Sequence, residues 1–333
     1  MLIKAAGRRV PRRLLGLALV LCMAAWGALI GGAPTVPSVA SAADAGSSPA
    51  APEAKPSAKA WAFAAFADCR GEDERPKGSF EGLLREIREP RADVKVKFPR
   101  IEFAVGCGDL KLASDNHRNW DLWQEAFRDA ADKPCLFPLI GNFDSGDVPF
   151  NRKVVLPAQK NVVGSDPEKY SVDWKNVRLI VSRDLPYVEG LIESAPAAIE
   201  HVFVADHYPI FPRYAHEQTP GAGDAKFWSM LVKHRDKVRA FLVGHTHHYS
   251  RMRVADPGGK ARELEGFPDE EGGIYQIDCG NAGRPSHGEP STTLLEVMID
   301  GKDVHFRVVQ APNKTPAEFR VADEWQMSAR TPE

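Results

Sequence analysis

Residues 240–249 read Ala-Phe-Leu-Val-Gly-His-Thr-His-His-Tyr, and this stretch decides the fold that the sequence predicts. Its first four residues are apolar, which is typical of a short buried β-strand. Gly244 ends the apolar run, and His245 and His247 follow it with one residue between them. Two imidazoles this close together on a tight turn are typical of a ligand site, because imidazole nitrogens bind transition metals. We therefore predict a strand that presents two histidine ligands at its carboxyl end.

Metal-binding side chains also follow four other predicted strands, and they are Asp68, Asp109, Asn142 and His207. Ligands of open α/β sheets bind at the carboxyl ends of the strands. Carboxylate, amide and imidazole groups suit zinc, manganese or iron, so the pattern predicts a metal site at this edge of the sheets. The predicted strands are short apolar runs bounded by turn residues, at Trp61–Ala67, Ile101–Gly106, Leu136–Ile140, Val177–Val181, His201–Ala205 and Ala240–Val243.

Amphipathic stretches separate these apolar runs and predict helices. The predicted helices are Phe80–Arg88, Asn119–Ala131, Pro186–Ser194 and Asp224–His234. Later in the chain, strands are predicted without helices between them, at Ile274–Asp278, Thr293–Ile299 and Val304–Val309. An α/β part followed by a β-rich part predicts layered sheets covered by helices.

The order Asp68, Gly108-Asp109, Gly141-Asn142, His207 and Gly244-His-Thr-His247 resembles the calcineurin-like metallophosphoesterases, which include the purple acid phosphatases. The resemblance covers nearly all of residues 61–309. It implies an α/β fold in which a layered β-sandwich is flanked by helices. It also implies a metal site at the carboxyl ends of the strands.

The resemblance further implies a ligand set for two divalent metal ions, which would be manganese, zinc or iron. Asp109 would bridge both metals, and Asn142, His207 and His245 would complete the second one. Asp68 and His247 would hold the first metal. Two such metals can share a hydroxide and clamp a phosphoryl group. The implied function is hydrolysis of a phosphate ester or anhydride by a metal-activated water, with a small phosphorylated molecule as substrate.

Arg70 is the first departure from the family pattern, because the family has a histidine there. Arginine stays protonated and cannot bind a metal. Purple acid phosphatases also lack that histidine, but they supply a tyrosine three residues after the bridging aspartate, where this chain has Leu112. We therefore expect one tightly held metal and one weaker one. Arg70 could grip the substrate phosphate in a bidentate way, or its charge could replace the first cation.

Phe143 is the second departure, because it replaces the histidine of the family's Gly-Asn-His motif. That histidine is thought to assist the transition state or to protonate the leaving group, and the loss of a general acid typically costs about 10²–10⁴-fold in rate. His117 and His248 are alternative proton donors, and Asp144 retains the acidic residue that often follows the motif. The candidate catalytic residues are therefore Arg70, Asp144 and His248.

These two departures leave a second function open. The chain could be a catalytically degenerate metallophosphoesterase-like protein that binds a phosphorylated ligand or a partner. The intact ligand set of the second metal favours the enzyme, whereas Arg70 and Phe143 favour the binding protein. A third interpretation, a redox protein that uses Cys69 and Cys107, rests only on the nearness of these cysteines to the motifs.

Residues 1–42 are typical of an export signal. Five basic residues precede the apolar run from Leu14 to Ile30, and the segment contains no acidic residue. The small residues Ala40 and Ala42 fit cleavage after Ala42. An uncleaved anchor helix is the alternative. We expect an exported protein, periplasmic or extracellular, without a stable membrane span after cleavage. The remaining parts are predicted as a linker rich in Ala, Pro and Ser (43–60), a metallophosphoesterase domain (61–310) and a polar tail (311–333) from which Phe319 and Trp325 could dock.

The charge of the predicted mature chain excludes some partners. The 333 residues include 43 Lys and Arg and 45 Asp and Glu. Without the five basic residues of 1–42, 38 basic and 45 acidic residues remain. An acidic body argues against nucleic-acid binding, which needs a basic field, and the sequence assigns no oligomeric state. The cysteines lack paired metal-site spacing and are predicted as small buried apolar residues, at Cys69, Cys107, Cys135 and Cys279.

Overall fold

The chain divides into two compact units, Met1–Ala50 and Ala51–Glu333, and every described residue belongs to the second unit. The computed structural model describes residues 56–69, 77–89, 94, 96–110, 135–144, 161–213, 222–258, 269–282, 291–312 and 318–328. Several predictions lie outside these residues, and they are the signal segment 1–42, most of the linker 43–60, the helix Asn119–Ala131, Arg70, Leu112 and His117. No helix among the described residues is long and apolar enough to cross a membrane.

The first sheet joins the amino-terminal strands to the carboxyl-terminal ones. Its strands in spatial order are β13 (Arg320–Ser328), β12 (Asp303–Pro312), β11 (Ser291–Asp300), β1 (Trp61–Phe66), β2 (Ile101–Gly106) and β3 (Cys135–Pro138). β1, β2 and β3 run parallel, while β11, β12 and β13 pair antiparallel. The carboxyl ends of β1, β2 and β3 therefore lie next to one another at one edge of the sheet.

The second sheet contains the strands that precede the predicted histidines. Its strands in spatial order are β4 (Val162–Asp166), β5 (Lys169–Trp174), β6 (Val177–Val181), β7 (His201–Ala205), β8 (Val238–Val243), β10 (Ile274–Cys279) and β9 (Tyr249–Val254). β6, β7, β8 and β10 form the parallel centre, and antiparallel strands complete both sides. The carboxyl ends of β7 and β8 are therefore neighbours.

The two sheets pack face to face through an aromatic core. Alternate residues of β1 point to opposite faces, as the pleat of a strand requires, so Phe63 faces the other sheet while Phe66 faces away from it. The Phe63 ring stacks on Phe103 with centroids 4.8 Å apart and meets the edge of Phe203, from β7, at 5.0 Å. These contacts hold the two sheets in one sandwich.

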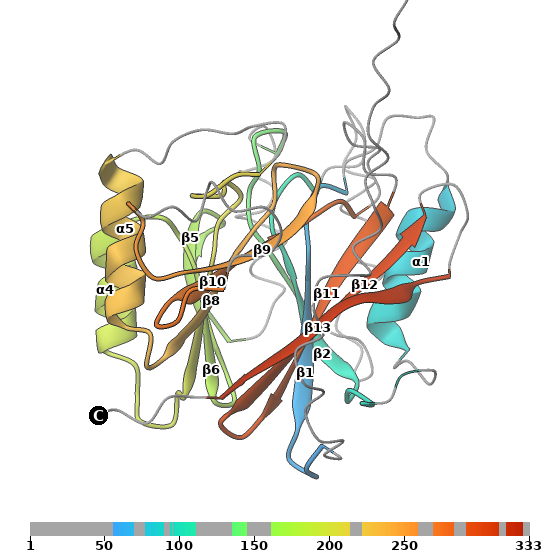
Figure 1. Ribbon diagram of the computed structural model, residues 1–333, viewed down its shortest axis with the longest axis horizontal. Coiled ribbons are helices and arrows are strands. Elements are labelled where there is room, and N and C mark those ends of the chain that lie inside the picture. The colour runs from blue at the N-terminus through green and yellow to red at the C-terminus, as the bar shows by residue number, and fades with distance from the viewer. Residues whose placement is uncertain are drawn as a thin grey trace, which may run out of the picture. The chain divides into compact units, whose positions relative to one another are not determined.

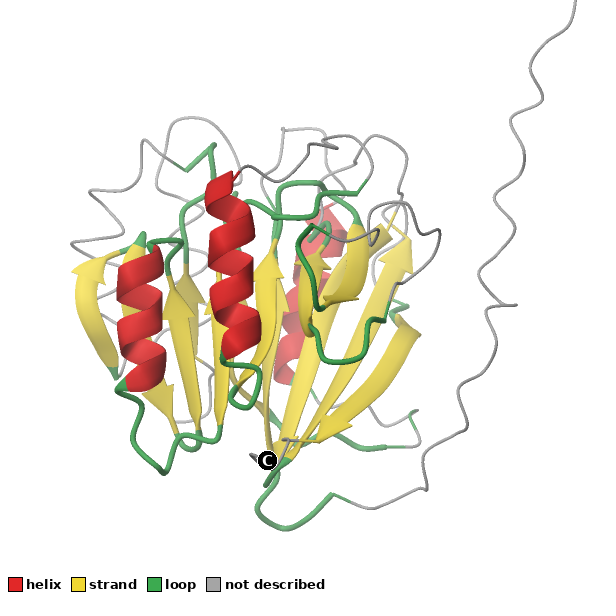
Figure 2. Cartoon of the chain, turned by 60° about the vertical axis from the view of Figure 1, so that its left-hand side comes forward, coloured by secondary structure: helices red, strands yellow, loops and turns green. Residues whose placement is uncertain are grey.

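Helices cover the outer faces of both sheets (Figures 1 and 2). α1 (Lys77–Arg88) packs Leu83 and Ile87 on the first sheet. α4 (Leu185–Glu193) and α5 (Ala222–Lys233) cover the second sheet, with Ile192 and Trp228 in its outer cluster. α4 begins at an N-cap, Asp184, whose carboxylate accepts a hydrogen bond from the Tyr187 amide. The predicted β-sandwich flanked by helices is confirmed.

The carboxyl-terminal segment differs from its prediction. Residues 311–333 were predicted as a loose polar tail after a domain ending at 310, but Arg320–Ser328 forms β13 and pairs with β12. Trp325 stacks on Phe306 with ring centroids 4.8 Å apart, and Phe319 is buried. β13 is polar because it is an edge strand with one exposed face, so its sequence lacks the apolar run expected of a buried strand.

Candidate metal centre

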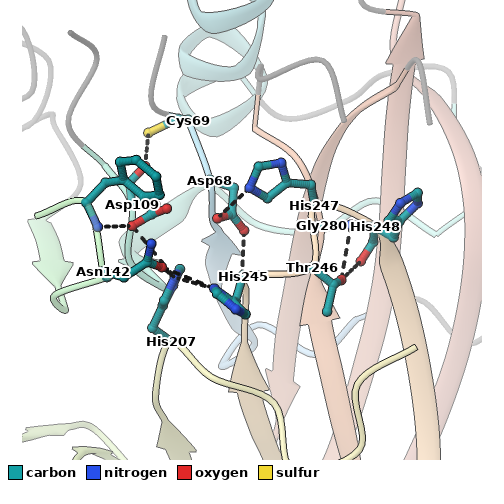
Figure 3. A network of polar contacts seen from close by, with 12 residues as sticks. Asp68, Cys69, Asp109, Asn142, His207, His245, Thr246, His247, His248 and Gly280 are labelled. Atoms are coloured by element: carbon teal, nitrogen blue, oxygen red, sulfur yellow. Dashed lines mark hydrogen bonds and ion pairs between the residues drawn. The ribbon is translucent and has the colours of Figure 1, made fainter. Parts of the chain in front are cut away.

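Six predicted ligands lie at the carboxyl ends of strands from both sheets. Asp68, Asp109 and Asn142 follow β1, β2 and β3 in the first sheet, while His207 follows β7 in the second. His245 and His247 follow β8, the neighbour of β7. Figure 3 shows these side chains converging from the two sheets. The structure thus brings together all six residues that the sequence nominated.

Four of these residues form a compact group, the His207 cluster, which consists of Asp109, Asn142, His207 and His245. The Nε2 atom of His207 lies 3.0 Å from Oδ1 of Asn142 and 3.3 Å from Nδ1 of His245. It lies 3.6 Å from Oδ1 of Asp109. The same Asn142 oxygen lies 3.1 Å from Nδ1 of His245. Four potential ligand atoms therefore surround one small volume.

A backbone contact determines which nitrogen of His207 carries the proton. The Nδ1 atom lies 2.9 Å from the carbonyl oxygen of Cys107, which can only accept a hydrogen bond. Nδ1 is therefore the protonated nitrogen, and Nε2 presents a lone pair. That lone pair faces the Asn142 and Asp109 oxygens, which are also acceptors. Such a convergence of acceptors fits a bound divalent cation.

Asp68 and His247 form the second part of the site, here called the Asp68–His247 pair. The Nε2 atom of His247 lies 3.6 Å from Oδ1 of Asp68. The other Asp68 oxygen accepts a hydrogen bond from the His245 amide at 2.8 Å. Carboxylate and imidazole atoms of Asp68, Asp109 and His207 all lie within 4.8 Å of one another. The pair is therefore contiguous with the His207 cluster, and the whole donor set fits metal ions.

Four predicted ligands have a left-handed backbone conformation, and they are Asp68 (φ 55°), Asp109 (φ 52°), His245 (φ 75°) and His247 (φ 61°). This conformation costs roughly 1–2 kcal/mol for a residue with a side chain. Among the described non-glycine residues, only Asn161 and Lys175 share it. Strain of this kind concentrates at functional sites, where the surrounding structure enforces it. The loops therefore hold these four side chains in a fixed position, at a cost in the folding stability of the protein.

Gly108 allows the second sheet to approach the loop that carries Asp109. It has a positive φ of 86°, and a Cβ atom at this position would collide with the His207 ring. Only glycine fits such a close approach without moving the imidazole. Gly108, beside Asp109, therefore leaves the space that the His207 ring of the other sheet occupies.

Asp144 is fully buried, and one oxygen of its carboxylate accepts hydrogen bonds from two different loops. Its Oδ2 atom accepts hydrogen bonds from the amides of Leu110 and Gly141, at 3.1 and 3.0 Å. These amides belong to the loops that carry Asp109 and Asn142. This placement fits a positioning residue, and a catalytic role for Asp144 stays a prediction.

Asp278 is a supporting residue that sequence reasoning missed. Its Oδ2 atom accepts a hydrogen bond from the Thr246 hydroxyl at 2.6 Å, and its Oδ1 atom accepts one from the Gly280 amide at 3.1 Å. Thr246 lies between the two histidine ligands, so the buried Asp278 anchors their turn. A carboxylate at the end of a buried apolar run, Ile274–Asp278, was the signal that could have revealed it.

His248 and Phe143 lie next to predicted ligands in the sequence, and the structure places them differently. Figure 3 shows His248 on the side of the turn away from Asp109 and Asn142. A role of His248 in protonating the leaving group stays a prediction. Phe143 donates its backbone amide to Oδ1 of Asp109 at 2.8 Å, while half of its side chain is exposed.

Arg183 organises the loop that follows His207. Its guanidinium donates to Asp224 at 2.6 Å, to Asp206 at 3.4 Å and to the Tyr208 carbonyl at 2.9 Å. Burial raises the pKa of Asp206, and the Arg183 charge opposes that shift. Burial and then the negative charges of Asp109 and Asp206 raise the pKa of the Tyr208 phenol. Tyr208 is therefore a neutral side chain at neutral pH.

The cysteines form no disulfide among the described residues. Cys69, Cys107 and Cys279 are buried and Cys135 is partly buried. Burial raises the pKa of Cys279 well above its usual value, with a contribution from the neighbouring Cys107 thiol. The Cys279 thiol therefore stays protonated, and the burial of Cys69, Cys107 and Cys279 agrees with the prediction of small buried apolar residues.

Comparison with known proteins identifies similar folds. No protein-family model and no curated protein sequence matches the chain. Among solved structures, GAP50, the anchor in the inner membrane complex of Plasmodium, matches with a TM-score of 0.51 and 13% identity over 82% of this chain and 90% of that one. Vps29 of Chaetomium thermophilum matches with a TM-score of 0.43 and 10% identity, over 81% and 98% of the two chains. A predicted phosphoesterase of Streptococcus pneumoniae matches with a TM-score of 0.38 and 13% identity, over 81% and 98%.

Proposed function

We propose that this chain, which has the calcineurin-like metallophosphoesterase fold, is an exported metal-dependent phosphoesterase. Its substrate would be a small phosphate ester or anhydride, and nucleic acid is not a proposed partner. One observation carries the proposal. Potential ligand atoms of the His207 cluster converge within 3.0–3.6 Å of His207 Nε2, and Asp109 and His245 have a strained backbone. A cation bound between these atoms would satisfy all of them at once.

The proposal divides the ligands between two metal sites. Asp109, Asn142, His207 and His245 would hold one divalent ion, and Asp68, His247 and the shared Asp109 would hold another more weakly. When bound, such ions polarise phosphoryl oxygens and lower the pKa of water to near neutrality. Manganese, zinc and iron all suit these nitrogen and oxygen donors.

The chain's own residues orient this site and control proton transfer around it. The Cys107 carbonyl fixes the His207 tautomer, and Asp68 fixes the turn of His245 through its amide. Asp144 holds the two loops that carry Asp109 and Asn142. Phe143 has no proton to donate, so the leaving oxygen departs as an anion or takes its proton from water. Good leaving groups are therefore favoured.

A second candidate function is a catalytically degenerate protein that binds a phosphorylated ligand or partner. The observation that favours it is the lack of an aligned proton donor among the described residues, with Phe143 in the loop and His248 turned away. Metal ions would then serve to bind phosphate without turnover.

The deciding experiment combines metal analysis with an activity screen. The mature chain from residue 43 is purified, dialysed and analysed for metals, and then screened with aryl phosphate monoesters and diesters in added manganese or zinc. Bound metal together with turnover that disappears in His207→Ala supports the enzyme. Bound metal without turnover supports the binding protein, and no bound metal contradicts both. The mass of the exported product tests cleavage after Ala42.

A further inference from the structure

Two exposed aromatic side chains belong to residues that directly follow ligands of the His207 cluster. Among the described residues, only four large apolar side chains are strongly exposed, and they are Phe143 (52%), Tyr208 (42%), Val163 (66%) and Val321 (41%). Both aromatic members of this set directly follow a predicted ligand in the sequence, since Phe143 follows Asn142 and Tyr208 follows His207. The two valines lie instead on strands β4 and β13, which are edge strands.

Contacts place the Tyr208 ring and the Phe143 backbone beside the ligands. The Phe143 amide donates to Oδ1 of Asp109 at 2.8 Å, which places that residue against the cluster. The Tyr208 ring lies 4.7 Å from the His245 ring and 5.0 Å from the His207 ring, measured between centroids. Arg183 donates to the Tyr208 carbonyl at 2.9 Å. Both exposed rings therefore belong to residues whose backbone is held in place by a hydrogen bond.

Exposed aromatic rings beside a polar site indicate a ligand with an apolar part. Water-exposed aromatic area is unfavourable, and pockets for small molecules combine aromatic walls with a few convergent polar groups. Here the polar groups belong to the His207 cluster and the aromatic surface to Phe143 and Tyr208. A ligand that matches both carries a phosphoryl group joined to a planar ring through a single ester oxygen.

We propose that Phe143 and Tyr208 form a subsite for the aromatic leaving group of an aryl phosphate ester, an inference that rests on the proposed phosphoesterase function. The Tyr208 ring lies against two of the ligand imidazoles and Phe143 directly follows a third ligand, so a ring stacked in this subsite would lie close to the phosphorus atom. This favours an aryl ester over a nucleotide, whose base is separated from the phosphate by a sugar. An aryl oxide also leaves without a proton, which matches the phenylalanine at position 143.

The kinetic test separates stacking from leaving-group acidity. Phenyl phosphate is compared with an alkyl phosphate whose alcohol is made equally acidic by fluorination, in wild type, Phe143→Ala, Tyr208→Ala and Tyr208→Phe. We expect each alanine variant to lower the aryl-to-alkyl ratio of kcat/KM by about tenfold, since ring stacking on an aromatic side chain is of that size. Tyr208→Phe keeps the ring and should keep the ratio. Val321→Ala removes a similarly exposed apolar side chain from β13, which lies three strands from β1 in the first sheet, and is the matched control.

A binding test distinguishes failure of this inference from failure of the proposed function. Phenylphosphonate and methylphosphonate, which are not hydrolysed, are titrated calorimetrically into the manganese-loaded protein. Tighter binding of phenylphosphonate that Phe143→Ala reduces about tenfold supports the subsite, even if no ester is turned over. Turnover with an aryl-to-alkyl ratio that the alanine variants leave unchanged overturns the subsite and leaves the enzyme proposal intact. Neither turnover nor a preference for phenylphosphonate overturns both.

Discussion

The His207 cluster and the Asp68–His247 pair lie side by side and are built differently. In the cluster, three ligand atoms lie 3.0–3.6 Å from His207 Nε2, and the Cys107 carbonyl fixes the tautomer. In the pair, one imidazole lies 3.6 Å from one carboxylate oxygen. The residue that would add a ligand to the pair in the family is Arg70, which cannot bind a metal. We therefore predict that the pair binds a metal less tightly than the cluster does.

The ligands of the cluster and those of the pair can therefore be substituted separately. Each ligand of the cluster follows its own strand, so loss of a ligand beside β1 leaves the residues after β3, β7 and β8 unaffected. Only Asp109 belongs to both proposed metal sites. The predictions below test whether the two halves differ in metal affinity and in activity.

The largest expected effect is that of His207→Ala. It removes a buried ligand that contacts the other three members of the cluster, so we expect at least a 100-fold loss of metal affinity and loss of any activity. Metal content after dialysis and calorimetric titration measure the effect. His305→Ala, in β12, is the matched histidine control and should retain the metal. Full metal content in His207→Ala would contradict the assignment of this residue.

His247→Ala should have a smaller effect that is confined to the other half. We expect the dialysed wild type to retain one metal per chain and this variant to retain it too, because the His207 cluster is untouched. Activity should fall about 10–100-fold, since the weaker metal loses a further ligand. Elemental analysis and kcat/KM at several manganese concentrations check both statements. Two retained metals in wild type, or none in the variant, would refute the unequal affinities.

Phe143→His tests whether the site lacks a proton donor beside the His207 cluster. An imidazole beside Asp109 could protonate a poor leaving group, so we expect about a tenfold gain for alkyl phosphates and little gain for aryl phosphates. A series of esters with graded leaving-group pKa measures the change in slope. Phe143→Leu introduces no titratable group and should keep the steep slope of wild type. A shallow slope in wild type would indicate that another residue supplies the proton.

The smallest effect on the site is expected from His201, a buried histidine at the opposite end of β7 from His207. Its Nδ1 atom accepts a hydrogen bond from Arg239 and its Nε2 atom donates to the Gly301 carbonyl, both at 2.8 Å. Burial and then the Arg239 charge lower the pKa of His201 to about 4. The folded state therefore holds His201 neutral, while the unfolded chain binds a proton below about pH 6.5.

This pKa difference predicts a loss of stability in acid that is independent of the metal. Above about pH 6.5, His201 does not lower the free energy of unfolding. As the pH falls from about 6.5 to about 4, protonation of the unfolded chain lowers this free energy by roughly 3 kcal/mol in total. Urea unfolding of metal-free protein between pH 4 and 7 measures it. His201→Gln does not titrate and should show a shallower pH dependence. Equal slopes in the two proteins would contradict the assignment.

The sequence by itself determined the strands that carry the site and the ligands that follow them. Val177–Val181 and His201–Ala205 match β6 and β7 in full. These strands are buried on both faces, so their residues form continuous apolar runs that can be read locally. The ligands were readable for a similar reason, because Asp109 and His245 each follow a glycine directly after such a run. Local chemistry was sufficient at these positions.

The tertiary structure alone decided which polar residues serve the site and which do not. Asp144 and Asp278 support loops through contacts with distant residues, and His248 turns away from a histidine only one residue before it. β13 became visible as a strand only through its pairing with β12, because an edge strand has no apolar run. Contacts between residues far apart in the chain determine burial, direction and hydrogen bonding, and residue type alone does not encode them.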